Sequence, residues 1–243
     1  MTIPRTSKFI ILGSLYFSQG IPNGFFRHTV PVVFLESGLS LEDIALFLPA
    51  LYLPWVLKFL WSIVVERFHS KKQGKYRSWI IPLQILTAGT IVALANWQFG
   101  TSLSIFVLGV ALINIFSSVQ DVSTDGYAVK ILSYQERGWG NAIQVGSYWL
   151  GFVVGGGFIL MLMNSLGWNF LLIAMALITL LATIPLLLTR PTKRAQKEEV
   201  SQSLNQSIGL LNFLRQPTVF KILPCGRLSN ARGLYSVVGT NHV

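Results

Sequence analysis

Residues 103–130, LSIFVLGVALINIFSSVQDVSTDGYAVK, begin as one of the most apolar stretches of the chain and end with two acidic side chains. A helix needs about 20 apolar residues to cross the hydrocarbon core of a bilayer, and this stretch is long enough. Asp121 and Asp125 are spaced i, i+4, so both carboxylates lie on one face of such a helix. Because the 243-residue chain has only 9 acidic residues, we interpret this pair as a candidate functional feature.

The composition of the whole chain indicates a lipid-embedded protein. Hydrophobic residues make up 52% and charged residues 12%, whereas soluble domains carry about 25% charged residues. The net charge of +10 arises from short loops between apolar runs and not from one basic domain, which argues against a nucleic-acid-binding protein. The single cysteine, Cys225, excludes a disulfide framework and a cysteine-based metal site. We expect no cofactor and no metal.

Six segments are long and apolar enough to be membrane-spanning helices. Helix is the expected structure because every backbone polar group in lipid must be paired within its own segment. The first segment lacks a small-residue cleavage site, so we interpret it as a retained span and not as a signal peptide. The sequence therefore predicts an all-α polytopic membrane protein with a six-helix bundle in residues 1–189. The predicted spans are roughly 9–35, 44–65, 79–97, 103–125, 142–163 and 168–189.

Lysine and arginine are confined to alternate connections between the predicted spans. The connections near 36–43, 96–102 and 164–167 contain neither residue, whereas the N-terminus and the other connections contain several. Cytoplasmic loops retain the positive charge. We therefore predict a multi-pass protein of the cell inner membrane, with its N-terminus and the residues from 190 onward in the cytoplasm.

The residues after the sixth predicted span have a different composition. Residues 190–207 are polar and charged, and we predict a cytoplasmic linker there. Residues 208–243 begin like a seventh span and then lose all hydrophobic periodicity. We expect an aberrant tail, caused by truncation or by a shifted reading frame.

Polar side chains form stripes on the first, fourth and fifth predicted helices, and polar groups inside a membrane protein mark a path or a site. In the first helix the stripe has spacings of 3, 4 and 4, and the segment GIPNG at 20–24 interrupts the helix. Interrupted spans often line substrate sites. The alternative is a packing kink, with Arg27 extending to the outer interface. The predicted substrate cavity comprises Tyr16, Gln19, Asn23, Arg27, Asn114, Gln144 and Tyr148.

The depth of Asp121 predicts a gate at the cytoplasmic side. Asp121 lies 18 residues after Leu103, which is about 27 Å of helix and close to the hydrocarbon thickness of about 30 Å. The alternatives are that the two aspartates bind a proton or the substrate directly, or that they form a plain solvated helix end. Lys58 either pairs with Asp121 or extends to the interface. The predicted gate comprises Lys58, Glu66, Arg67, Gln120, Asp121, Asp125, Glu136 and Arg137.

Glycines follow the polar stripe of the fifth predicted helix. Gly151 and Gly155 are spaced i, i+4, which permits two helices to approach closely. We predict a packing role for these two residues and for Gly156.

Four stretches of the sequence resemble known transporter families. The stretches KFLWSIVVERF at 58–68 and GKYRSW at 74–79 resemble the loop signature of the major facilitator superfamily, although Glu66 replaces the usual Asp and Ser62 replaces the leading Gly. Residues 120–144, QDVSTDGYAVKILSYQERGWGNAIQ, resemble AmpG-type muropeptide permeases and acetyl-coenzyme A transporters. Residues 16–47 resemble siderophore permeases of the RhtX/FptX type.

The resemblance implies a twelve-helix transporter of two six-helix halves that hold the solute between them. This chain is then the N-terminal half. The implied function is proton-coupled, alternating-access transport of a medium-sized polar solute such as a siderophore or a muropeptide. The implied partners are the lipid bilayer, the small-molecule solute, and a separate C-terminal half or a second copy of the chain.

Two other functions remain open from the sequence. The first is an inert or regulatory half-transporter. The second is a membrane-embedded Mg²⁺-dependent prenyltransferase, because Asp-x-x-x-Asp motifs hold Mg²⁺ and a diphosphate in such enzymes. The remaining acidic residues form no second cluster inside a span on the same side, so we expect no enzymatic activity.

Overall fold

The computed structural model describes residues 3–68, 74–97 and 103–189. The chain divides into two units, Met1–Gln196 and Lys197–Val243, and the described residues all belong to the first. The linker predicted at 190–207 and the tail predicted at 208–243 lie outside the described residues.

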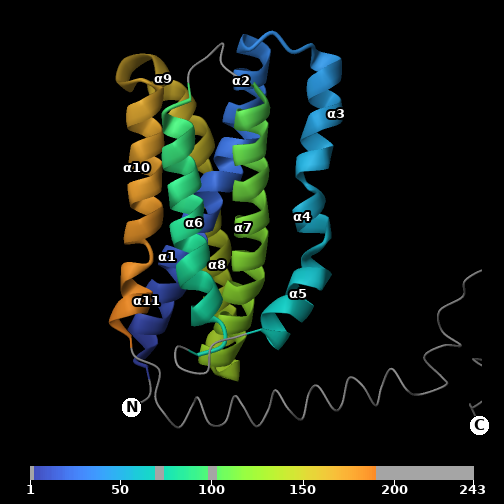
Figure 1. Ribbon diagram of the computed structural model, residues 1–243. Helices are drawn as coiled ribbons and strands as arrows, with labels where there is room; N and C mark the ends of the chain where they lie inside the picture. The colour runs from blue at the N-terminus through green and yellow to red at the C-terminus, as the bar shows by residue number, and fades with distance from the viewer. Residues whose placement is uncertain (1–2, 69–73, 98–102, 190–243) are drawn as a thin grey trace, which may run out of the picture. The chain divides into compact units, whose positions relative to one another are not determined.

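The described part of the chain is helical, without strands, and its long helices stand side by side (Figure 1). Labels and bounds follow the chain. They are α1 Arg5–Gly24, η1 Phe25–Thr29, α2 Val30–Glu36, α3 Leu41–Leu51, α4 Leu53–Val56, α5 Lys58–Arg67, α6 Arg77–Ala95, α7 Leu103–Ile131, η2 Tyr134–Glu136, α8 Arg137–Val153, η3 Val154–Phe158, α9 Ile159–Leu166, α10 Trp168–Leu181 and α11 Ile184–Leu188.

Within the described residues, five helical runs are long and apolar enough to cross a membrane, and each matches a predicted span. The first predicted span is the helical run α1–η1–α2, which lies among the others (Figure 1). It falls outside the set of five because polar side chains such as Gln19 and Asn23 lower its mean hydropathy. The all-α, polytopic membrane fold is confirmed. The five runs are Leu41–Arg67, Arg77–Ala95, Leu103–Ile131, Tyr134–Leu166 and Trp168–Leu188.

The predicted interruption of the first helix at residues 20–24 is wrong. Pro22 lies inside α1, and the helix continues into the π-helical turn η1 and then α2. The amide of Phe25 donates to the carbonyls of Ile21 and Pro22. The π-helical turn lies just before Pro31, which has no amide to donate to the carbonyl of Arg27, and there the amide of Val30 donates to the carbonyl of Phe25.

The second predicted span is instead the one whose helix is interrupted. It consists of α3, α4 and α5, which are separated at Tyr52 and Leu57. Pro49 lies inside α3, and Pro54 lies in the first turn of α4. A proline removes one amide donor and bends or ends the helix before it, so Pro54 accounts for the break at Tyr52, and the break at Leu57 follows three residues after Pro54.

Buried apolar side chains fill the bundle between α1, α6, α7 and α10. The largest cluster of buried residues includes Phe25, Phe34, Phe106 and Trp168, all at most 8% exposed. The helices α3–α5 lie at the edge, where they approach α7 (Figure 1). The bundle thus leaves one side of α3–α5 free of contacts with the other described helices.

Glycines make the contact between α1 and the α8–η3 segment possible. A Cβ at Gly151 would lie 2.0 Å from the carbonyl oxygen of Phe17, and one at Gly155 would lie 1.9 Å from that of Ile21. The structure places Gly156 in the same contact, facing α1 and η1. Small residues let two backbones approach in this way. Two glycines on α1 that were not singled out from the sequence, Gly20 and Gly24, complete the contact.

Candidate functional site

An ion pair joins the broken second helix to α7. The Lys58 ammonium, in the first residue of α5, donates to a carboxylate oxygen of Asp121. Asp121 is only 7% exposed, and the Lys58 ammonium also lies 4.8 Å from the ring centroid of Trp55. Of the two alternatives for Lys58, the structure shows the ion pair. Removing one member of a buried pair leaves the other charge uncompensated, so the two helices depend on each other here.

Asp125 lies one turn further along α7 and connects three helices. The Tyr16 hydroxyl of α1 donates to Asp125 Oδ1 at 2.6 Å. The Gln144 side chain of α8 donates to the same oxygen at 3.4 Å. Next to this group, Gln19 Nε2 donates to Thr124 Oγ1 at 2.8 Å. The polar stripes of the first, fourth and fifth predicted helices therefore meet at this level.

Two hollows flank Asp125. One has a volume of about 420 Å³ and lies between α5 and α7, and the other has about 290 Å³ and lies between α1, α7 and α8. Both are lined partly by charged side chains, and the second also by amide side chains. Asp125 thus borders a hollow on two sides. The polar residues of the first are Lys58, Ser62, Glu66 and Tyr76, and those of the second are Tyr16, Arg137, Asn141 and Gln144.

The other acidic residues of the predicted gate pair elsewhere. Glu66 accepts from the ammonium of Lys75 and, at 3.2 Å, from the hydroxyl of Tyr76. Glu136 accepts from Lys8 Nζ at 2.7 Å. These two contacts tie the loops and the N-terminus to the ends of the helices. They are separate from the Lys58–Asp121 pair.

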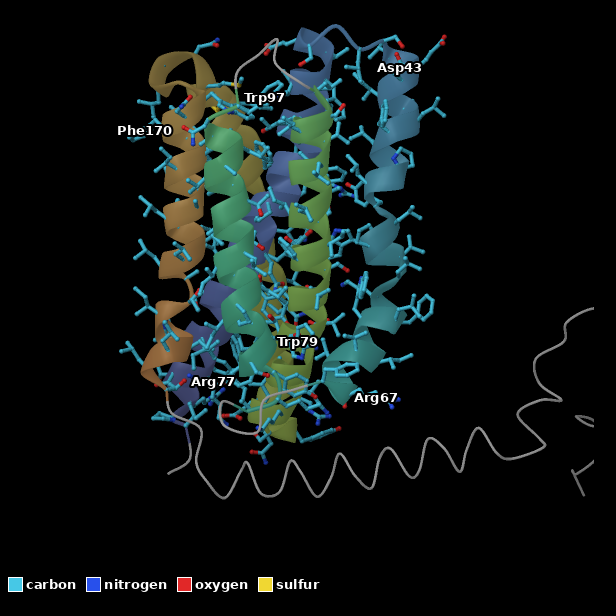
Figure 2. The ribbon with its side chains drawn as sticks, in the orientation of Figure 1. Asp43, Arg67, Arg77, Trp79, Trp97 and Phe170 are labelled. Atoms are coloured by element: carbon cyan, nitrogen blue, oxygen red, sulfur yellow. The ribbon has the colours of Figure 1, made fainter. Side chains whose placement is uncertain are left out.

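The predicted arginines of the gate do not reach the two aspartates. Arg67 is exposed at the end of α5 (Figure 2), and Arg137 lies over the ring of Tyr134. Among the described residues, neither arginine takes part in an ion pair. Gln120 is buried in α7 at 3% exposure. The predicted gate is therefore not one cluster, because Glu66 and Glu136 pair with Lys75 and Lys8 and not with the group around Asp121.

The predicted cavity residues divide by burial. Gln19, Asn23 and Asn114 are buried in the bundle, and Asn114 Oδ1 accepts from the indole of Trp55 at 3.1 Å. Arg27 is exposed and donates to the hydroxyl of Tyr52. Tyr148 is half-buried on α8 and packs against neighbouring rings. The structure thus places these residues on α1, η1, α7 and α8, and two of them, Arg27 and Asn114, bond to side chains of the broken second helix.

The carbonyl of Pro54 is a part of the site that the sequence analysis missed. It accepts from the hydroxyl of Ser118 at 2.7 Å and from the indole of Trp61 at 2.9 Å. A discontinuous span can present backbone carbonyls to a path in this way. The signal was present in the sequence, because Pro49 and Pro54 both fall inside the second predicted span.

No group of three or more His, Cys, Asp or Glu residues that could hold a metal ion occurs in the part of the chain that the structure describes. What the arrangement offers is a set of charged and hydrogen-bonded groups on adjoining helices. Placing such groups inside a membrane costs free energy, so their presence marks a functional site.

Comparison with known proteins identifies relatives of similar type. The family model described as acetyl-coenzyme A transporter 1 matches residues 8–171. The anhydromuropeptide permease of Escherichia coli K12 is 32% identical over 185 residues, which is 74% of this chain and 37% of the permease. An uncharacterized protein of Haemophilus influenzae is 27% identical over 220 residues, which is 90% of this chain and 52% of that protein.

A membrane protein of Saccharomyces cerevisiae is 30% identical over 160 residues, covering 56% of this chain and 28% of the yeast protein. The chain therefore spans about half or less of the length of the curated relatives it matches. The family description and the permease name belong to transporters and not to enzymes. Since the family model matches residues 8–171, well over half of the chain, the chain belongs to the acetyl-coenzyme A transporter 1 family.

Proposed function

We propose that this chain forms the N-terminal six-helix half of a secondary active transporter of the major facilitator type. The whole transporter would move a medium-sized polar solute across the inner membrane by proton-coupled alternating access. The relative named an anhydromuropeptide permease supports a muropeptide as the solute, and a siderophore is the other candidate. The partners are the bilayer, the solute, and a second half or a second copy of the chain.

The observation that carries the proposal is the Lys58–Asp121 pair between the broken helix and α7. A transporter must have two states that differ in their contacts, since a solute shifts the equilibrium only by its differential affinity for them. An ion pair between a short, loosely packed helix and a long one can form in one state and open in the other. We assign the Lys58–Asp121 pair to the cytoplasmic gate.

Asp125 is the candidate for proton coupling. Its partners are the neutral side chains of Tyr16 and Gln144, and it borders both hollows. Its place one turn from Asp121 would connect a change at Asp125 to the movement of α5.

Uptake measurements test the proposal. Expressed alone, the 243-residue chain should give no saturable uptake, because one half supplies only one wall of the path.

The positive arm of the test joins residues 1–189 to the C-terminal half of the Escherichia coli permease. In cells without their own permease, this chimera should restore anhydromuropeptide uptake, and the intact permease serves as the control. Saturable uptake by the chain alone would contradict the half-transporter proposal. A chimera that reaches the membrane and remains inactive would favour an inert or regulatory half.

The proposed topology is tested by reporter fusions. Arg67 and Arg77 lie at the end of the bundle opposite to Asp43 and Phe170 (Figure 2). Because positive residues stay in the cytoplasm, a phosphatase fused after Ser40 should be active in the periplasm, and one fused after Ser133 should be inactive. An active fusion after Ser133 would overturn the orientation.

A further inference from the structure

A second positively charged side chain, Arg27, lies just after α1, and it differs from Lys58 in its surroundings. Arg27 is in the π-helical turn η1 and is exposed. Its Nε donates to the hydroxyl of Tyr52 at the first break of the second span. Its guanidinium carbon lies 5.5 Å from the ring centroid of Tyr52 and 5.9 Å from that of Phe152.

Aromatic side chains of α8 continue this surface. The ring of Trp149 meets that of Phe152 at 5.1 Å and that of Tyr148 at 5.9 Å, both in an edge-to-face manner. Trp149 is 51% exposed, so a large part of its ring is free to contact another molecule. His28 meets Phe152 from the other side at 5.2 Å. We call Tyr52, Tyr148, Trp149 and Phe152 the aromatic platform.

Lys58 and Arg27 differ in whether they are paired with an acidic side chain. Lys58 is paired with Asp121. Arg27 takes part in no ion pair among the described residues. A guanidinium has five N–H donors in a planar fork, and Tyr52 accepts from the Nε position. The outer edge of the fork, which binds carboxylates and phosphates in a bidentate manner, is therefore available.

An arginine that merely extends to the membrane surface would have different contacts. Such a side chain points along its own helix toward water. Arg27 lies nine residues before the end of α2 at Glu36, which is about 13 Å of helix. Its guanidinium is held sideways between rings from the second span and from α8. This geometry holds the cation beside two rings of the aromatic platform, those of Tyr52 and Phe152.

We propose that Arg27 and the aromatic platform form a recognition site for a solute that carries an anionic group on a ring. The guanidinium would bind the carboxylate or phosphate, and the rings would stack against a sugar or a base, as aromatic side chains do. This inference rests on the proposed transport function and narrows the solute to ring-bearing anions. Sugar acids and nucleotides share this chemistry.

The test measures binding of two matched pairs of probes to the purified 243-residue chain in lipid nanodiscs, by calorimetry. The sugar pair is N-acetylmuramic acid and N-acetylglucosamine, which differ by a carboxylate-bearing lactyl group. The base pair is adenosine monophosphate and adenosine. At least one anionic probe should bind about 10- to 100-fold more tightly than its neutral partner, the range expected for charge-assisted hydrogen bonds. The pair that responds identifies the source of the ring.

Variants separate the anion site from the ring site. Arg27→Gln should reduce the binding of the anionic probe to that of its neutral partner, and Trp149→Ala should weaken both members of the pair. Arg5→Gln is the matched control, because Arg5 also lies over a ring, that of Phe9 at 5.4 Å, but at the start of α1. It should leave binding unchanged.

Equal binding of charged and neutral probes would overturn the proposal, as would the absence of saturable binding of either anion. So would an Arg27→Gln variant that binds the anion as tightly as the unchanged chain while its thermal unfolding is unaltered. The measurement requires no transport. If the chimera fails to take up solute, the proposed function is contradicted. A positive binding result for Arg27 and the aromatic platform would still stand.

Discussion

Replacing Gly155 by leucine should separate α1 from α8 and give the largest loss of stability of any single change considered. A Cβ at this position would lie 1.9 Å from the carbonyl oxygen of Ile21, and that atom belongs to the backbone of α1, so no rotamer change relieves the clash. Overpacking costs about 3 kcal/mol or more when the backbone must move. For a chain of this size the midpoint of thermal unfolding should fall by roughly 6–12 °C.

The same helix offers a matched control. A Cβ at Gly146 in α8 would meet nothing within 4 Å, and the same holds for Gly157 in η3. Gly146→Leu should leave the unfolding midpoint unchanged or raise it slightly, because leucine has the higher helix propensity. Thermal unfolding in detergent, followed by tryptophan fluorescence, compares the variants. Similar midpoints for Gly155→Leu and Gly146→Leu would show that the close α1–α8 contact does not stabilise the bundle.

The spans were predictable from the sequence because hydropathy and length decide them locally. The ends of the helices were less predictable. The fourth span was expected to end at Asp125, whereas α7 continues to Ile131. Hydropathy marks where a helix leaves the lipid, and nothing requires the helix itself to stop there. The stop comes at Ser133, which begins the capping of the next turn.

The breaks were assigned to the wrong helix for a physical reason. A proline in a membrane helix is tolerated where neighbouring groups pair the freed backbone. Pro22 lies between Gly20 and Gly24, which hold α1 against α8, so the run stays helical. Pro54 lies in a segment with few neighbours, where Ser118 takes up its free carbonyl. The sequence contains both prolines but not the packing that distinguishes them.

Only some of the partners of Asp121 and Asp125 could be predicted from the sequence. The i, i+4 spacing placed Asp121 and Asp125 on one side of α7, and charge made Lys58 a candidate partner. The contact between Tyr16 and Asp125 depends on how α1 and α7 are rotated toward each other. Hydropathy does not determine that rotation. The glycines of α1 and α8 fix which faces of those two helices meet, and they do not contact α7.

Asp121→Asn should reduce transport far more than solute binding in a transporter that contains this half. The change leaves the Lys58 ammonium beside a neutral amide. Removing one partner of a fully buried pair costs about 3–5 kcal/mol, and a smaller value is expected here because Lys58 keeps 39% of its side-chain surface exposed. A loss of about 1.4 kcal/mol from one of the two states already changes their ratio tenfold.

Uptake into vesicles should therefore fall at least about tenfold, since cycling requires both states, while binding in detergent should change by less than about threefold. The exchanged pair Lys58→Asp with Asp121→Lys should recover part of the uptake, because it restores opposite charges on α5 and α7. Asp43→Asn is the control for a lost carboxylate, since Asp43 lies exposed at the other end of the bundle and its carboxylate, within the described part of the chain, accepts only from Ser40. If Asp121→Asn lowers binding and uptake equally, Asp121 contacts the solute directly and the gate must be sought elsewhere. If the exchanged pair is as inactive as the single variant, the charge attraction between α5 and α7 is not what the transport cycle uses.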